Sequence, residues 1–420
     1  MYSMYINRQA EILLEKIVSG KKAGIILGAR QVGKTTLVEH VLRSRKTFFL
    51  NFDIEVDKAR FKAASALPPV DALRSFGNPD VLVIDEAQRL PEASRIVKGW
   101  IDTRLPVRFL LLGSSSLNLL DQTTESLTGR NRKLVLPPLL FSETLQTQSW
   151  ADEGFDSGRL REHFAPQLRA YLMQRLAFGS YPEVVTSEEP IQLLRELSSD
   201  YLWKDILQTG LVKNPALIKR LLLLLAHQSG SEVSVNELAT QLQMARPTVN
   251  HYLDLLEHTF VIFRLDAFST NPRKEISKSK KVFFWDTGIR NALLNTFTTN
   301  EFRPDIGSLW ENWVIAEAAK QNAMLGCPVE LFFWRTRSQS EVDLVVKHEQ
   351  SLRAFEIKWA SGPPFFHPSG SSPSKQLYPS PDPRHCRAFR NAYGVDVETI
   401  RPDNPFFNLF GPLSEYSGLK

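Results

Sequence analysis

The chain has 420 residues, of which 43% are hydrophobic and 23% are charged, and it carries a formal net charge of +5 with a pI near 9.0. This length predicts about two to four packed domains, and the apolar content excludes a chain that is disordered throughout. A positive excess this small permits contact with nucleic acid but does not by itself argue for it.

The cysteines and the apolar runs bear on the cellular compartment. Cys327 and Cys386 are too few for a disulfide framework, and no Cys/His spacing indicates a zinc site. Residues 1–20 have helical apolar spacing without a signal-peptide core, and no apolar run approaches the roughly 20 residues that a membrane helix needs. We therefore expect a cytoplasmic protein without membrane contact.

Five apolar segments in the first third of the chain predict buried strands. Helical patterns separate them, and this alternation is typical of a parallel sheet with helices on both faces. We expect one α/β domain over residues 1–145. The expected strands are 24–27, 48–52, 81–84, 109–112 and 133–136.

A Gly-rich loop follows the first of these strands and precedes a helical pattern. It matches the P-loop pattern G-x-x-x-x-G-K-[ST], in which backbone N–H groups and a helix N-terminus surround a phosphate. Lys34 is expected to reach the β- and γ-phosphates of ATP, and the Thr35 hydroxyl to bind Mg2+. The expected nucleotide-binding residues are Gly28, Ala29, Arg30, Gln31, Val32, Gly33, Lys34, Thr35 and Thr36.

Two acids, Asp85 and Glu86, end the third strand. Asp85 is expected to hold Mg2+, usually through water, and Glu86 to orient and deprotonate the attacking water. A strand capped by solvated acids is the alternative, and the P-loop in the same α/β pattern argues against it. The two motifs together predict a magnesium-dependent ATPase.

Two further polar residues are candidates for catalysis. Ser114 follows the fourth strand, where it could sense the γ-phosphate or position the water, or could simply cap the next helix. Arg130 precedes the fifth strand and could reach a phosphate in its own chain or in a neighbouring subunit, which leaves self-association open. Its alternative is a surface arginine paired with a carboxylate.

Residues 146–300 are expected to form a helical and winged-helix domain. Apolar spacing over 232–257 predicts a helix-turn-helix, and 261–265 and 282–284 are candidate wing strands. This module either contacts DNA or packs within the chain as a structural unit. The candidate DNA-binding residues are Arg246, Thr248 and Asn250 on the second helix and Lys278, Lys280 and Lys281 near the wing.

Residues 301–420 are expected to form an α/β restriction-endonuclease-like domain. A helix over 308–325 precedes three strands, at 331–335, 342–347 and 353–358. Residues 361–385, rich in Pro and Ser, predict a loop or linker.

Three residues on these strands match the PD-(D/E)xK nuclease arrangement. Asp343 and Glu356 would bind magnesium, and Lys358 would lower the pKa of an attacking water. Glu311 or Glu317, on the preceding helix, could complete the site. The alternative is a buried ion cluster in an inactive relic of that fold, since fold does not establish activity.

The order of these motifs resembles that of a known family. After the P-loop and Asp85-Glu86-Ala87-Gln88 come the motifs at 113–115 and 129–130, Pro137-Pro138-Leu139-Leu140-Phe141-Ser142-Glu143, and those at 281–288, 307–312, 333–336 and 341–343. Together they resemble the AAA-14/DUF4143 class of P-loop ATPases, which are AAA+-related and similar to STAND-type and archaeal ATPases. The resemblance implies ATP binding, hydrolysis and a nuclease-like C-terminal domain.

Three functions are compatible with these motifs. In the first, ATP hydrolysis drives the winged-helix and nuclease-like modules on or near DNA. In the second, the chain is a STAND-type signalling switch without DNA contact. In the third, it is a metal-dependent nuclease with a regulatory ATPase.

Overall fold

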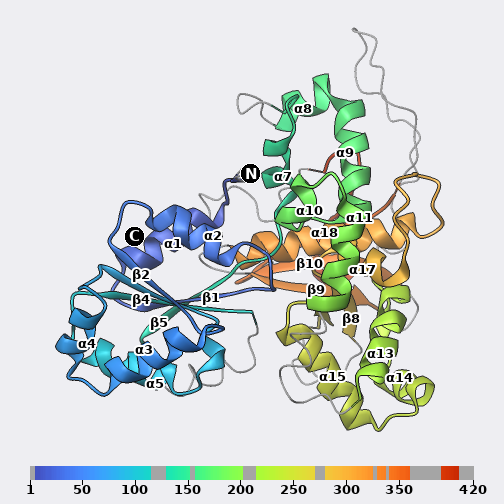
Figure 1. The fold of residues 1–420 in the computed structure, drawn as a ribbon. Helices are drawn as coiled ribbons and strands as arrows, with labels where there is room; N and C mark the ends of the chain where they lie inside the picture. The colour runs from blue at the N-terminus through green and yellow to red at the C-terminus, as the bar shows by residue number, and fades with distance from the viewer. Residues whose placement is uncertain are drawn as a thin grey trace.

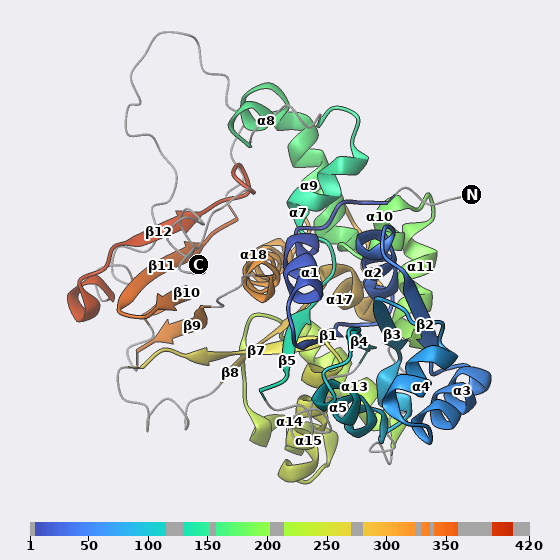
Figure 2. The same ribbon diagram turned by 90° about the vertical axis from the view of Figure 1, so that its left-hand side faces the viewer.

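The computed structural model describes residues 5–114, 129–151, 157–201, 214–269, 280–324, 329–336, 340–359 and 389–405, the side chains of residues 200 and 201 excepted. These residues form a five-stranded sheet and a seven-stranded sheet, with helices packed around them (Figure 1). The seven-stranded sheet lies beside α18 (Ile306–Ala323), as the turned view shows (Figure 2). Within the described parts, no helix is long and apolar enough to cross a membrane.

The first sheet is parallel and has five strands in the order β2-β3-β4-β1-β5. This confirms the expected α/β fold with its P-loop between the first strand and a helix. The strands are β1 (Ala23–Leu27), β2 (Thr47–Asn51), β3 (Val81–Asp85), β4 (Arg108–Gly113) and β5 (Asn131–Val135).

Alternating side chains of these strands serve two cores, because successive residues of a strand point to opposite faces. Ile25 and Leu82 belong to the core on one face, together with residues of α3, α4 and α5. Ile26 and Val83 belong to the other core, which includes residues of α1 and α2. The helices are α1 (Ala10–Ser19), α2 (Lys34–Leu42), α3 (Glu55–Ser65), α4 (Pro69–Ser75) and α5 (Ala93–Asp102), with a short turn η1 (Ala87–Arg89).

The middle of the chain is mainly helical. Leu222 and Val249, from two of its helices, lie in the same apolar cluster as Ile26, so the first sheet and this region share one core. The helices before residue 202 are α7 (Phe141–Thr144), η2 (Leu145–Thr147), α8 (Ser157–His163), α9 (Ala165–Phe178), α10 (Pro182–Thr186), α11 (Pro190–Glu196) and η3 (Leu197–Tyr201). Those that follow are α13 (Pro215–His227), α14 (Val235–Leu242), α15 (Arg246–His258) and α17 (Thr287–Leu294).

The second sheet has seven strands in the order β12-β11-β10-β9-β7-β8-β6. Asp266 of β7 pairs in parallel with Phe332 of β9, so strands from both sides of residue 300 belong to one sheet. The expected boundary at that residue therefore passes through a continuous sheet. The strands are β6 (Glu232–Val233), β7 (Ile262–Ala267), β8 (Lys280–Phe284), β9 (Glu330–Arg335), β10 (Glu341–His348), β11 (Ser351–Ile357) and β12 (Val397–Ile400).

The segment after β8 fixes the loop between α9 and α10. The Asp286 carboxylate accepts hydrogen bonds from the backbone N–H of Ser180 at 2.6 Å and of Ile289 at 3.2 Å. A Cβ on Gly179 would lie 1.9 Å from the Asp286 Oδ1 atom, and φ there is +70°, so this position requires glycine. Asp286, which lies within the 281–288 motif, thus holds the loop that precedes α10.

Candidate nucleotide-binding site

The P-loop connects β1 to α2 and has the backbone shape that a phosphate cradle needs. Gln31 and Gly33 have positive φ values of 59° and 90°. A Cβ on Gly28 would lie 2.2 Å from the carbonyl oxygen of Leu136, so glycine is required there by close approach. Lys34 is 7% exposed, and its Nζ donates to the carbonyl oxygens of Gly28 and Ala29 at 2.9 Å each.

Most of the expected loop residues line one cavity of about 480 Å3. Ala29 and Val32 are buried in the core, so they shape the loop from behind. The loop residues that line the cavity are Arg30, Gln31, Gly33, Lys34, Thr35 and Thr36.

The two residues expected to hold magnesium face each other. Thr35, in the first turn of α2, donates its hydroxyl to Asp85 Oδ2 at 2.7 Å, while the other carboxylate oxygen accepts the backbone N–H of Glu86 at 2.8 Å. A hydroxyl and a carboxylate oxygen are ligands that Mg2+ accepts. The donor set therefore fits a magnesium ion between α2 and the end of β3.

Glu86 and Ser114 are joined through a glutamine. Glu86 lines the cavity and has φ 51° and ψ 41°, a left-handed conformation that begins the turn after β3. The Gln88 side-chain amide donates to the Glu86 carboxylate at 2.6 Å and to Ser114 Oγ at 3.3 Å. Ser114, directly after β4, thus shares the Gln88 amide with the expected base.

The opposite wall of the cavity comes from segments that the sequence motifs did not indicate. Tyr5, Ile6 and Arg8 precede α1, and their only sequence signal is a position before an amphipathic helix. The Tyr5 ring stacks on His40 with centroids 3.8 Å apart. The remaining wall residues are Leu139, Pro182, Glu183 and Thr186, the last three from α10.

Arg130 lies away from this cavity. Its carbonyl oxygen accepts the N–H of Ala23, at the start of β1. The P-loop begins after the other end of β1, and at 3.3 Å per residue the two ends of this stretch are about 16 Å apart. Its Nε is 2.7 Å from Asp102 Oδ1, and both side chains are over 40% exposed. The expectation that Arg130 reaches a phosphate in its own chain is wrong, and the arginine pairs with a carboxylate instead.

The C-terminal carboxylates gather around a lysine. Lys281 Nζ lies 2.8 Å from Glu311 Oε1 and 2.5 Å from Glu341 Oε1, and its side chain is 4% exposed. Burial lowers the pKa of Lys281, but the charges of Glu311, Glu341 and Asp343 outweigh this and raise it above its ordinary value. Lys281 is therefore a buried ammonium, and its expected contact with a DNA phosphate is wrong.

The other residues of the expected nuclease site are also engaged. Asp343 is 8% exposed and accepts the backbone N–H of Ile357 at 2.7 Å, and Lys358 pairs with Glu356 at 2.7 Å. Among the residues that the structure describes, no group of three or more acids, histidines or cysteines is arranged to hold a metal. The donors present do not fit the divalent metal of the PD-(D/E)xK arrangement, because the Lys281 ammonium already stands among the acids.

The remaining candidate DNA-binding residues differ in exposure. Arg246 and Asn250 are exposed on α15, and Thr248 is partly buried. Lys280 pairs with Asp266 at 2.9 Å on the surface. Lys278 lies outside the described residues.

Three family models match this chain. An AAA domain (AAA_14) covers residues 20–145, a domain of unknown function (DUF8612) covers 169–300, and another (DUF4143) covers 306–366. The first includes the P-loop and both acids, and the last includes Asp343 and Glu356.

Relatives match over most of their length. The uncharacterized protein Rv2008c of Mycobacterium tuberculosis is 30% identical over 360 residues, which is 85% of this chain and 75% of that protein. The uncharacterized protein MJ1544 of Methanocaldococcus jannaschii is 26% identical over 355 residues, 81% of this chain and 75% of that protein. Among solved structures, the Walker-type ATPase of Pyrococcus abyssi is similar with a TM-score of 0.47 and 15% identity, covering 69% of this chain and 96% of that one. The chain belongs to the AAA_14/DUF4143 family of P-loop ATPases, together with the mycobacterial protein.

Proposed function

We propose that this ATPase is a magnesium-dependent nucleotide switch, in which ATP binding and hydrolysis change how two adjoining parts of the molecule are placed relative to each other. The observation that carries the proposal is the composition of the cavity. Lys34 and Thr35 belong to the five-stranded sheet domain, whereas Pro182, Glu183 and Thr186 belong to α10 of the helical region. A nucleotide in this cavity contacts both, so its affinity depends on how they are placed.

Each cavity residue has a defined role in the proposed reaction. Lys34 leaves the Gly28 and Ala29 carbonyls to pair with phosphate oxygens, which it binds as a compact charge. Thr35 and Asp85 would hold Mg2+, which supplies charge neutralisation at the phosphates. Glu86 accepts a proton from the attacking water, and Gln88 holds its carboxylate in place.

Replacing Glu86 with glutamine tests the hydrolytic step. We expect Glu86→Gln to keep ATP affinity within a few-fold of wild type and to lower kcat by roughly 100-fold to 10,000-fold, because an amide cannot take the proton. Phosphate release and equilibrium binding of ATP measure the two quantities. Glu92→Gln makes the same change at a partly exposed carboxylate paired with Lys62 and should leave kcat unchanged. Full turnover by Glu86→Gln would remove Glu86 as the base.

The lysine-centred acid cluster bears on what the switch controls. With Lys281 between Glu311 and Glu341, a metal at Asp343 would meet a fixed positive charge nearby. This geometry disfavours a metal-dependent nuclease. It favours a C-terminal half that binds a partner or transmits the state of the nucleotide site, without cleaving DNA. Plasmid nicking by the wild-type protein with Mg2+, lost on Asp343→Ala, would reverse this preference.

DNA contact through α15 is the second candidate function. The order α13, β6, α14, α15, β7, β8 suits a winged helix, in which α15 would be the recognition helix. Arg264 pairs with Asp254 and Glu257, so the two acids of α15 are neutralised and oppose a DNA backbone less than their charges suggest. Arg246 and Asn250 remain exposed on that helix.

Fluorescence anisotropy with duplex DNA at low salt tests this candidate. We expect Arg246→Ala to weaken binding and to reduce the slope of log K against log salt by about one, the value for a single lost phosphate contact. Lys347→Ala removes a lysine paired with Glu330 on β10 and should not change the slope. If wild type binds no DNA with or without ATP, the switch acts without DNA.

A further inference from the structure

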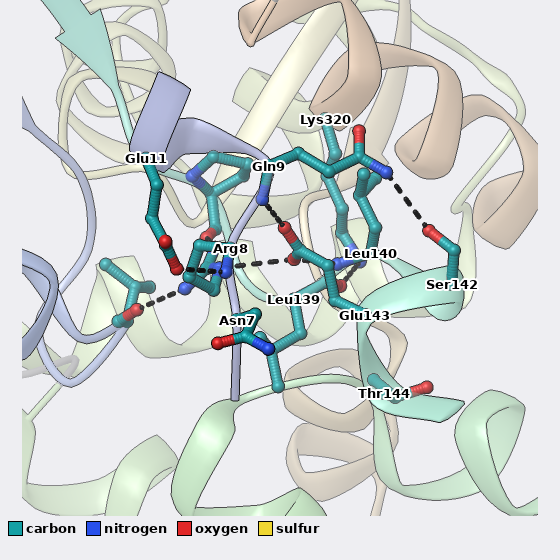
Figure 3. Close-up of polar contacts among 12 residues, drawn as sticks. Asn7, Arg8, Gln9, Glu11, Leu139, Leu140, Ser142, Glu143, Thr144 and Lys320 are labelled. Carbon is teal, nitrogen blue, oxygen red and sulfur yellow. Dashed lines mark hydrogen bonds and ion pairs between the residues drawn. The ribbon is translucent and has the colours of Figure 1, made fainter. Parts of the chain in front are cut away.

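Arg8 is a buried cation that contacts the P-loop. Its guanidinium donates to three acceptors: the carbonyl of Val32 at 3.0 Å, the carbonyl of Pro137 at 2.7 Å and the Glu143 carboxylate at 3.1 Å (Figure 3). The side chains of Arg8 and Glu143 are 4% and 2% exposed. Because Arg8 also lines the cavity, this pair belongs to the nucleotide site and not only to the core.

The contact with Val32 sets the orientation of a peptide group in the phosphate cradle. A trans peptide is planar, and its C=O and N–H point in opposite directions. Holding the Val32 oxygen on Arg8 therefore turns the N–H of Gly33 to the other side of the loop. Gly33 has a positive φ of 90°, and a glycine backbone can adopt several other conformations. The hydrogen bond from Arg8 to Val32 therefore favours one orientation of the peptide group between Val32 and Gly33.

Glu143 fixes Arg8 and is itself fixed from two sides. Its Oε1 accepts the backbone N–H of Gln9 at 2.7 Å, and its Oε2 accepts that of Leu140 at 2.9 Å as well as the arginine (Figure 3). A carboxylate with this many donors has one position available. The position of Arg8 is thus tied to the start of α7.

A second buried ion pair holds the same segment from α18. Glu317 and Lys320 are 2.8 Å apart, with side chains 3% and 2% exposed. Lys320 donates to the carbonyl of Leu139 at 3.1 Å, and Glu317 accepts the N–H of Phe141 at 2.9 Å. The helix that carries them packs on β8 and β11 of the seven-stranded sheet.

The same segment also meets the loop before α10. The N–H of Leu139 donates to the carbonyl of Ser180 at 2.9 Å. Residues 137–143, here called the junction segment, therefore contact Arg8, helix α18 and the loop before α10.

We propose that Arg8, held by Glu143, is a positioning residue for the phosphate loop, and that the junction segment transmits the state of that loop to α18. This inference rests on the proposed nucleotide switch and assigns the part of the molecule that carries its signal. The two buried ion pairs both hold the junction segment, one from the P-loop side and one from α18, and neither is part of the hydrolytic step.

The positioning role is tested with Arg8→Lys and Glu143→Gln. A lysine keeps the charge beside Glu143 but lacks the planar fork that reaches three acceptors, and a glutamine keeps the shape but not the charge. We expect each to lower kcat/KM for ATP about tenfold or more, with a normal circular dichroism spectrum at the assay temperature. Gln146→Ala is the matched control. Gln146 lies just after the junction segment and forms hydrogen bonds with the backbone of Asn7, next to Arg8, at the exposed surface.

The kinetic readout separates positioning from mere stability. Loss of stability alone would lower the melting temperature while leaving kcat/KM per folded molecule unchanged. If both variants keep kcat/KM within twofold of wild type, Arg8 does not position the loop. Glu143→Gln also decides the matter if Arg8→Lys does not fold, because its side-chain oxygen still accepts hydrogen bonds.

Transmission is tested by hydrogen exchange of α18 with and without a non-hydrolysable ATP analogue and Mg2+. In wild type, we expect the analogue to slow exchange in α18. The double variant Glu317→Gln/Lys320→Met removes both members of the pair together, and it should bind the analogue with wild-type affinity while α18 no longer responds.

Two results would overturn the transmission role: an α18 that does not respond in wild type, or one that responds equally in the double variant. A wild-type protein that binds no ATP would instead remove the proposed switch itself. If wild type binds and hydrolyses ATP and the Arg8, Glu143 and Glu317/Lys320 variants behave like wild type, the positioning and transmission roles are wrong while the proposed switch stands.

Discussion

Replacing Lys34 with alanine is expected to raise the Kd for ATP at least about 100-fold and to abolish measurable hydrolysis. The lysine is buried at the base of the cavity, and truncating one partner of a buried charge pair costs about 3 kcal/mol or more, which corresponds to about two orders of magnitude in Kd. Isothermal titration with ATP and Mg2+ measures the affinity, and phosphate release measures the turnover.

A surface lysine provides the comparison for this variant. Lys16 is exposed in the last turn of α1, and Lys16→Ala should bind and hydrolyse ATP as wild type does. Without Lys34 the carbonyls of Gly28 and Ala29 lose a donor inside the loop, so the melting temperature should be recorded beside the affinity. A folded Lys34→Ala protein with wild-type affinity would show that the nucleotide binds elsewhere.

Replacing Lys281 with methionine is expected to lower the free energy of unfolding by about 3 to 5 kcal/mol, the usual cost of removing one partner of a buried ion pair. Glu311 and Glu341 would then face each other without the ammonium that both contact. Urea denaturation followed by tryptophan fluorescence measures the change, and Trp310 and Trp313 lie on the same helix as Glu311.

The neighbouring lysine makes a strict control for this prediction. Lys280 is in the same strand and also pairs with an acid, Asp266, but both side chains are over 40% exposed. Lys280→Met should therefore change the free energy of unfolding by no more than about 1 kcal/mol. Equal effects at the two positions would contradict the buried-ammonium description of Lys281.

The sequence predicted the parts of the site that are contiguous in the chain. The P-loop and the acids after β3 could be placed because each follows an apolar strand, and parallel strands bring their carboxyl ends to one edge of a sheet. Arg8 and α10 could not, because they reach the cavity only through packing, and the Glu143 that holds Arg8 is 135 residues away from it in the chain. No periodicity or motif encodes that distance.

The same reasoning explains the errors. Lys280 and Lys281 are adjacent in a strand, so their side chains point to opposite faces, and the charge pattern alone did not say which face was buried. Arg130 does precede the fifth strand, as the sequence indicated, but it pairs with the start of β1, whereas the P-loop follows the end of that strand. For Lys281 the face of the strand decides whether the side chain is buried, and for Arg130 the end of the strand decides whether it is near the P-loop. The composition of the strand indicates neither.

The pairing of β7 with β9 limits how the chain can be divided. A fragment that ended at residue 300 would leave the edge of β7 without its neighbour, and its open N–H and C=O groups would be free to pair with another copy. Such a fragment should self-associate, even though α13, α14 and α15 are complete within it. In the full chain, β9 pairs with this edge and covers it. The C-terminal strands therefore prevent edge-to-edge association of β7, in addition to being a candidate target of the switch.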